Sequence, residues 1–96
     1  MRDYEIMTIH RPELAEDEID KKVTELESYL SEKGAKVTKR DLWGKRRFAY
    51  EIDHLSEGYY SVLAFQSETE TINDFDRMLS LADEIIRHKI VRVDDA

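Results

Sequence analysis

The opening of the chain shows two different spacings of apolar residues. Residues 4–10 are rich in β-forming side chains and precede Pro12, which cannot donate to a ladder, so they predict a strand. Further along, the apolar positions recur every three or four residues, as on one face of a helix. Early acidic residues and a closing Gly34 are typical helix-terminus signals, so we expect a helix over about 14–33. Its apolar stripe comprises Ile19, Val23, Leu26 and Leu30.

The middle of the chain returns to a strand-like pattern. Residues 35–52 carry β-forming side chains, with Phe48, Tyr50 and Ile52 alternating to anchor one face in the core. Gly44 within this run indicates a bulge or a bend. Residues 53–58 are predicted to form a turn, and residues 59–65 a second strand, so the two strands form a long hairpin.

The last third of the chain predicts a second helix and a final strand. Ser67 and Glu70 have the spacing of a capping box, with Ser67 as the N-cap. The final strand, 85–93, places alternate residues on opposite faces, and a short tail, 94–96, follows it. The amphipathic stripe of the second helix comprises Ile72, Phe75, Met78, Leu79 and Ala82.

The order of these elements is β-α-β-β-α-β. It predicts an α+β protein of the ferredoxin-like class, in which two helices cover one face of a four-stranded antiparallel sheet. At 96 residues the chain is expected to be a single domain, 1–96.

Several predicted strands carry apolar side chains on both faces. In the first strand Ile6 alternates with Met7 and Ile9, and in the third Tyr60 alternates with Tyr59. A free monomer whose helices cover one sheet face would alternate more cleanly between apolar and polar residues. The uncovered face is therefore interpreted as a partner surface, although scattered exposed apolar residues are also normal on a monomer.

Charge is segregated along the chain, whose formal net charge is -7. Residues 13–32 carry eight acids and two bases, and residues 67–76 carry four acids and no base. Residues 33–50 carry seven bases and one acid, and residues 85–93 carry three bases and no acid. The acids fall mainly on the predicted helices and the bases on the strands. A negative protein with a basic sheet side can still bind phosphate locally.

The sequence offers little for catalysis or metal binding. There is no cysteine, and three separated histidines do not supply converging zinc ligands, so no metal, cofactor or catalytic residue is expected. The acids are explained by solvated helix faces. No apolar run reaches membrane-spanning length and no secretory segment opens the chain, so we expect no membrane association.

Nucleic-acid recognition has two candidate signals of unequal strength. Tyr59, Tyr60 and Phe65 could stack bases, but the usual surrounding motif is missing and Tyr60 could belong to the core. Phosphate contact is the stronger signal, because arginine pairs bidentately with phosphate and three consecutive bases exceed what strand-edge protection requires. The candidate bases are Arg46, Arg47, Arg87, Lys89 and Arg92, with Lys45 completing the consecutive run.

Four segments together resemble one family. "GKRRFAYEI" is similar to the second-strand signature of the bacterial small (30S) subunit ribosomal protein S-six family, and "RDYEIMTI" followed by proline is similar to its opening. "EGYYSVLAF" resembles its third strand, and "RMLSLADEIIRHKIVRVD" resembles its closing helix and strand. The resemblance covers essentially the whole chain in order.

The resemblance implies a structural ribosomal protein in the cytoplasm. Members of the family pair with the small basic ribosomal protein S-eighteen and bind the central domain of the small-subunit ribosomal RNA. By position, RNA contact is implied for Arg2, Lys45, Arg46, Arg47, Arg87, Lys89 and Arg92. Contact with the protein partner is expected for Met7, Ile9, Trp43 and Tyr59, with Trp43 equally open to a role at the core edge. The isolated chain is expected to be a monomer.

Two other functions are weighed against this one. A ferredoxin-like regulatory or small-molecule-binding domain would self-associate through its sheet and sediment as a dimer. A small hydrolase of the acylphosphatase kind needs an arginine and an asparagine near a phosphate loop. The only asparagine, Asn73, falls on an acidic helix turn, which argues against that chemistry.

Overall fold

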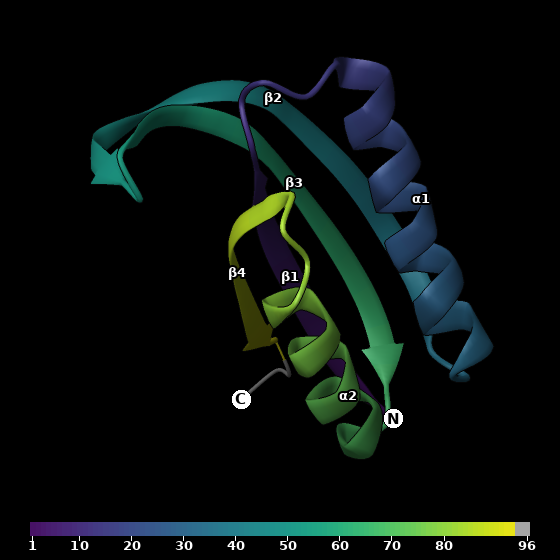
Figure 1. Ribbon diagram of the computed structural model, residues 1–96. Coiled ribbons are helices and arrows are strands. Elements are labelled where there is room, and N and C mark those ends of the chain that lie inside the picture. Colours follow the sequence, from purple (N-terminus) through teal and green to yellow (C-terminus); the bar gives the residue numbers. More distant parts are fainter. Residues whose placement is uncertain (94–96) are drawn as a thin grey trace.

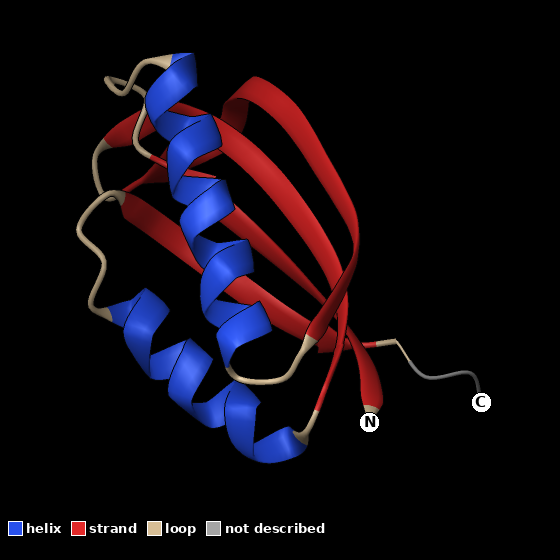
Figure 2. Ribbon diagram, turned by 90° about the vertical axis from the view of Figure 1, so that its right-hand side faces the viewer, coloured by secondary structure: helices blue, strands red, loops and turns tan. Residues whose placement is uncertain are grey.

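The computed structural model describes residues 1–93, and the predicted tail 94–96 lies outside the described residues (Figure 1). The elements are β1 (Arg2–His10), α1 (Glu16–Glu32), β2 (Lys36–Ile52), β3 (Leu55–Ser67), α2 (Thr69–Ser80) and β4 (Ile85–Arg92). The strands form one antiparallel sheet in the order β2-β3-β1-β4. Both helices lie on the same side of this sheet (Figure 2). The predicted ferredoxin-like order and layering are confirmed.

The core fills the space between the helices and one sheet face. Leu26 and Leu30 of α1 are fully buried, as predicted from their spacing, and the ring of Phe65 meets that of Phe75 edge to face at 6.0 Å. Each such side chain contributes about 1.5 to 3 kcal/mol through burial. The buried cluster is formed by Tyr4, Ile6, Ile19, Val23, Leu26, Leu30, Ala35, Leu63, Phe65, Phe75, Leu79 and Ile85.

Helix α1 ends as the sequence predicts. Gly34 has a φ of 84°, and its N–H donates to the carbonyl of Ser31 at 3.1 Å. The N–H of Ala35 reaches back to the carbonyl of Leu30 at 2.9 Å. These two bonds form a Schellman motif, which satisfies carbonyls that the helix itself leaves free and turns the chain into β2.

Helix α2 begins later than the capping-box prediction. Ser67 is buried at the end of β3, where it pairs with Arg2, and its hydroxyl donates to the carbonyl of Glu68 at 3.0 Å. The N-cap residue is Glu68, which makes no side-chain capping bond. The prediction of Ser67 as N-cap is wrong because strand pairing with β1 extends two residues beyond the predicted strand end.

The hairpin turn is tighter than the predicted loop over 53–58. Ile52 pairs with Leu55, so only Asp53 and His54 connect the strands, with φ values of 50° and 65°. Two successive left-handed residues match the twist of a two-residue hairpin, and aspartate is among the residues that tolerate this conformation. The β2–β3 hairpin therefore extends well past the helices (Figure 1).

Gly44 lies at an irregularity in β2, as predicted. Its φ is 86°, and the register with β3 shifts between Leu42 and Gly44. A left-handed glycine inserts an extra residue into one strand and increases the local twist. Tyr50, by contrast, is 76% exposed, so its predicted place in the core is wrong.

A polar cluster is enclosed in the helix-facing side of the sheet. His10 is fully buried, with its Nε2 2.9 Å from Oγ1 of Thr8 and 3.3 Å from Oγ of Ser61. Thr8 and Ser61 also share a hydrogen bond. Within residues 1–93, Nδ1 of His10 has no hydrogen-bond partner. Burial, assisted by the nearby charge of Lys22 and opposed by Glu84, lowers the pKa of His10 from 6.5 to about 4.

This histidine makes folding sensitive to mild acid. Because the pKa of His10 is lower in the folded chain than in the unfolded chain, the unfolded state binds more protons between pH 6.5 and pH 4. We expect the free energy of unfolding to fall by about 2 kcal/mol between pH 7 and pH 5, measured by urea denaturation. His10→Gln should be less stable at pH 7 but should lose this pH dependence, whereas His54→Asn in the exposed turn should keep it. An identical slope in His10→Gln would contradict the assignment.

Gly58 permits a close approach between β3 and the end of β1. A Cβ at this position would lie 2.8 Å from Cγ2 of Ile9, 2.9 Å from the carbonyl oxygen of His10 and 3.0 Å from the ring of Phe48. We expect Gly58→Ala to lower the free energy of unfolding by about 1 to 3 kcal/mol, because a backbone atom cannot move aside cheaply. Ser56→Ala, at an exposed position of the same strand, should change it by less than about 0.5 kcal/mol in the same denaturation assay.

Candidate nucleic-acid and protein interface

The sheet face that the helices leave uncovered, called the open face below, carries a mixture of apolar and basic side chains. The register places Met7 opposite Val62 on β3 and Lys89 on β4, and Ile9 opposite Tyr60 and Arg87. Alternation then assigns every second residue of each strand to this face. Its principal members are Glu5, Met7, Ile9, Lys39, Asp41, Trp43, Arg46, Phe48, Tyr60, Val62, Arg87, Lys89 and Val91.

Aromatic rings occupy the β2–β3 side of the open face. The ring of Trp43 stacks on that of Tyr60, with centroids 6.0 Å apart and planes 8° apart, and Phe48 meets Tyr60 edge-on. Trp43 Nε1 donates to Oδ2 of Asp41 at 3.2 Å, which holds the indole in place. Trp43 remains 45% exposed. It therefore does not belong to the core beneath the helices, and the predicted apolar surface on the open face is present.

Tyr59 lies on the opposite face from Met7, Ile9 and Trp43. It packs against the helix-side core, and the Nζ of Lys45 lies 5.2 Å from the centroid of its ring. The four predicted partner residues are thus divided between two faces. Tyr59 pairs with His10 of β1 and Tyr60 with Ile9, so Tyr60 is the residue that points outward and the interpretation of Tyr59 as part of the uncovered face is wrong.

The consecutive bases of the hairpin are also divided by strand alternation. Arg46 pairs with Gly58 on the open face, whereas Lys45 and Arg47 pair with Tyr59 and Glu57 on the other side. The expectation of a basic sheet side therefore holds for Arg46 alone among the three, since Lys45 and Arg47 lie on the helix side of the strand. All three are exposed, and within residues 1–93 neither arginine has an ion pair. The hairpin extends past the helices, so both of its sides are open to a ligand (Figure 1).

The remaining predicted RNA residues form two further groups. Arg87 and Lys89 are exposed on the open face of β4, opposite Ile9 and Met7, without an ion pair to any described residue. Arg2 and Arg92 are exposed near the opposite end of β1, where Arg92 pairs with Tyr4 and Arg2 with Ser67. The structure therefore brings Arg46, Arg87 and Lys89 onto one face and leaves the other four elsewhere.

One base of the same sequence run has a structural role instead. Arg40 contacts Glu27 at 2.6 Å and also pairs with Asp20, and both acids belong to α1. It thus ties β2 to the helix layer and is not available to a ligand. Sequence reasoning missed Lys39 and Tyr60 as members of the open face. Strand period alone would have found Lys39, since it alternates with Asp41 and Trp43.

A shallow groove crosses the open face. Its volume is about 350 Å³, and its walls include Met7, Val62 and Trp43 together with the ammonium-bearing side chains of Lys39 and Lys89. Such a lining suits binding by apolar contact and by charge. It holds no serine, cysteine or histidine. His10 and Ser61 are enclosed in the fold, so the described lining of this groove provides no nucleophile with a base beside it.

The described residues show neither a metal-binding cluster nor a membrane-spanning helix. No group of three or more histidine, aspartate or glutamate side chains in residues 1–93 is arranged to hold a metal ion. Within the same range, no helix has both the length and the apolar character needed to cross a bilayer.

Comparison with known proteins gives a consistent result. The family described as Ribosomal protein S6 matches residues 3–92. The small ribosomal subunit protein bS6 of Carboxydothermus hydrogenoformans is 43% identical over 94 residues, covering 98% of each chain. That of Desulforamulus reducens is 44% identical over 92 residues, covering 96% of this chain and 97% of the relative.

A solved structure agrees with the sequence relatives. The crystal structure of 30S ribosomal protein S6 from Thermotoga maritima superimposes with a TM-score of 0.91 and 31% identity, covering 96% of this chain and 87% of that one. The relatives are structural ribosomal proteins, and the prediction that the chain is not an enzyme is confirmed. From the family match, the sequence relatives and the shared fold, this chain belongs to the ribosomal protein S6 family, the S-six family that its sequence resembles.

Proposed function

We propose that the chain is a structural component of the small ribosomal subunit in the cytoplasm that binds the central domain of the small-subunit ribosomal RNA jointly with S-eighteen. Membership of the family supports the ribosomal role. The observation that carries the joint binding is the open face itself, where an apolar centre lies between two sets of bases that form no ion pair with the residues that the structure describes. Such a face suits a protein and an RNA that bind side by side.

RNA contact is assigned to the basic margins of the molecule. Arg46 and Arg47 extend from the hairpin, and Arg87 and Lys89 line the β4 side of the open face. Guanidinium groups that form no ion pair within residues 1–93 can pair bidentately with phosphate, and a local cluster of bases can attract phosphate despite the net charge of -7. Arg2, Lys45 and Arg92 are assigned as secondary contacts. Because the contacts are few, the salt dependence should be modest.

Protein contact is assigned to the apolar centre of the open face. Met7 and Trp43 lie there with Tyr60 supporting the indole ring, whereas Ile9 on the same face is already buried, at 7% exposure, and can add only a small contact. Aromatic and methionine side chains are enriched in interface cores, and burying them behind a partner removes apolar area from water. Self-association through this face is disfavoured, since two copies would bring like charges at Arg46, Arg87 and Lys89 together. The isolated chain is therefore expected to sediment as a monomer.

Co-purification tests the proposed role most directly. A tagged chain expressed in bacterial cells should travel with small ribosomal subunits on a sucrose gradient and remain with them after a moderate salt wash. Absence from the small-subunit fraction, while the chain remains soluble and folded, would contradict the proposal.

The hairpin arginines should act in RNA assembly and not in folding. We expect Arg46→Ala combined with Arg47→Ala to weaken binding to the central-domain RNA fragment in the presence of S-eighteen. The slope of log affinity against log salt should fall by about 1.5 to 2, measured by filter binding. Thermal stability should change by less than about 1 kcal/mol because both side chains are exposed. Lys21→Ala with Arg77→Ala removes two exposed bases from the helices and should leave the RNA affinity unchanged.

Trp43 provides an internal probe of partner binding, because it is the only tryptophan. We expect the addition of S-eighteen to shift its fluorescence emission to shorter wavelength, since the half-exposed indole would become buried. The RNA fragment alone should not produce this shift. Unchanged emission, under conditions in which sedimentation shows the protein complex, would place the partner elsewhere.

A further inference from the structure

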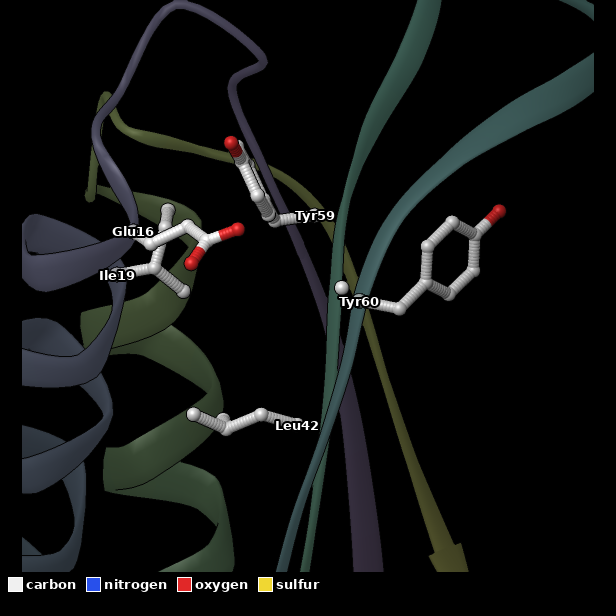
Figure 3. A pocket seen from close by; sticks show the side chains of 6 residues that line it. Glu16, Ile19, Leu42, Tyr59 and Tyr60 are labelled. Carbon is white, nitrogen blue, oxygen red and sulfur yellow. The ribbon is translucent and has the colours of Figure 1, made fainter.

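A small groove lies on the helix side of the sheet, between the first turn of α1 and the β2–β3 pair (Figure 3). Its volume is about 180 Å³, and its walls include Glu16 and Ile19 of α1, Leu42 of β2 and Tyr59 of β3. These four side chains extend into the same space, whereas the ring of Tyr60 points away toward the open face (Figure 3). We call this feature the Glu16 groove.

The size of the Glu16 groove limits what can occupy it. Sites for cofactors and small-molecule ligands usually measure about 300 to 1,000 Å³, so a volume of 180 Å³ suits a single long side chain better. The lining is largely aliphatic and aromatic, which favours an apolar stem. Leu42 is 42% exposed, so this lining is accessible from solvent.

The carboxylate of Glu16 favours a positively charged group at one end of the Glu16 groove. The carboxylate of Glu16 has no hydrogen bond or ion pair within residues 1–93. Its neighbours differ, since Glu18 accepts the N–H of Ala15 at 3.0 Å and Asp20 pairs with Arg40. The ring of Tyr59 already faces the ammonium of Lys45, a contact of the cation–π kind. The ring of Tyr59 therefore already has a cation beside it, and an aliphatic stem that ends in a cation matches the apolar lining and the carboxylate of Glu16.

We propose that the Glu16 groove receives a lysine or arginine side chain from an extended segment of the basic protein partner. The aliphatic stem lies on Ile19 and Leu42, and the cationic head pairs with Glu16 and lies near the ring of Tyr59. The inference rests on the proposed function for the existence of that partner. It gives Tyr59 a partner contact on the helix side of the sheet.

The position of the Glu16 groove makes it reachable from the open face. Leu42 and Trp43 are consecutive residues of β2, and they point to opposite faces of the sheet. Because β2 is an edge strand, a segment leaving the apolar centre passes around a single strand to reach Leu42. The Gly44 bulge lies at this crossing and keeps the edge free of a side chain.

Charge argues against the other occupants. An RNA phosphate inside the groove would approach the carboxylate of Glu16 and the acidic first turn of α1, both of which repel it, so the phosphate contact assigned to Lys45 beside the ring of Tyr59 has to be made outside the groove. A second copy of the chain would bring together two molecules of net charge -7 through their acidic helices. A basic protein segment is the occupant that the local charge attracts.

Site-specific cross-linking locates the occupant directly. The chain has no cysteine, so Leu42→Cys creates a unique attachment point for a photo-activated cross-linker beside the groove. We expect the full chain carrying this change to cross-link to S-eighteen at a peptide that contains lysine or arginine. Leu81→Cys, at a residue that is 78% exposed beyond α2, should give no such product. Cross-links to RNA or to a second copy of the chain would overturn the proposal.

A charge substitution measures the contribution of Glu16. We expect Glu16→Gln to weaken binding of S-eighteen by about threefold to fivefold in calorimetry at low salt, with a smaller effect at high salt. Glu32→Gln removes the same charge from the other end of α1 and should bind like the unaltered chain. Equal affinities for all three proteins would overturn the role of the groove and leave the proposed function standing. Failure of the unaltered chain to bind S-eighteen would overturn both.

Discussion

One-sided cover of the sheet is the constraint on which the rest of the structure depends. Two helices bury one face of four strands, and β1 at the centre pairs with both β3 and β4. Successive residues of each strand then face the core and the uncovered side in turn. Ile6, for example, is buried in the core, whereas Met7 lies on the uncovered face. A binding face is a direct product of this layering, since its residues are positioned by the same ladder that fixes the core.

Charge follows the same division. The acids of α1 and α2 lie mainly toward water. Two acids of α1, Asp20 and Glu27, form ion pairs with Arg40 of β2. Among residues 1–93, several exposed bases that form no ion pair lie on the open face and along the hairpin, including Arg46, Arg87 and Lys89. Net charge alone would class the protein as a poor ligand for RNA, but a phosphate within a Debye length responds mainly to the nearest side chains. Under the proposed function, this segregation would let one small protein attract both an anionic and a cationic partner.

The sequence was most informative where one local signal was enough. The helix over Ile19 to Leu30, its glycine stop and the bulge at Gly44 follow from spacing and from backbone freedom. Errors arose where pairing between distant strands decided the outcome. Ser67 has the spacing of a helix cap but is held in the sheet by pairing with β1, and Tyr59 and Tyr60 can be assigned to faces only from their pairing with β1 and β2. The order of the elements was enough to predict that one sheet face is left uncovered. Deciding which residues lie on that face required the pairing register of the strands.

Strand β2 contributes most to the proposed binding surfaces because it is long and lies at an edge of the sheet. An inner strand is flanked by neighbours on both sides, so a partner can reach only one of its faces at a time. Along β2, by contrast, Leu42 and Trp43 offer adjacent apolar side chains to opposite faces around a free edge. Arg46 lies further along the same strand, where it pairs with Gly58 of β3. A protein segment that wraps this edge would therefore be held next to RNA bound at the hairpin, and the two ligands would stabilise each other through one rigid strand.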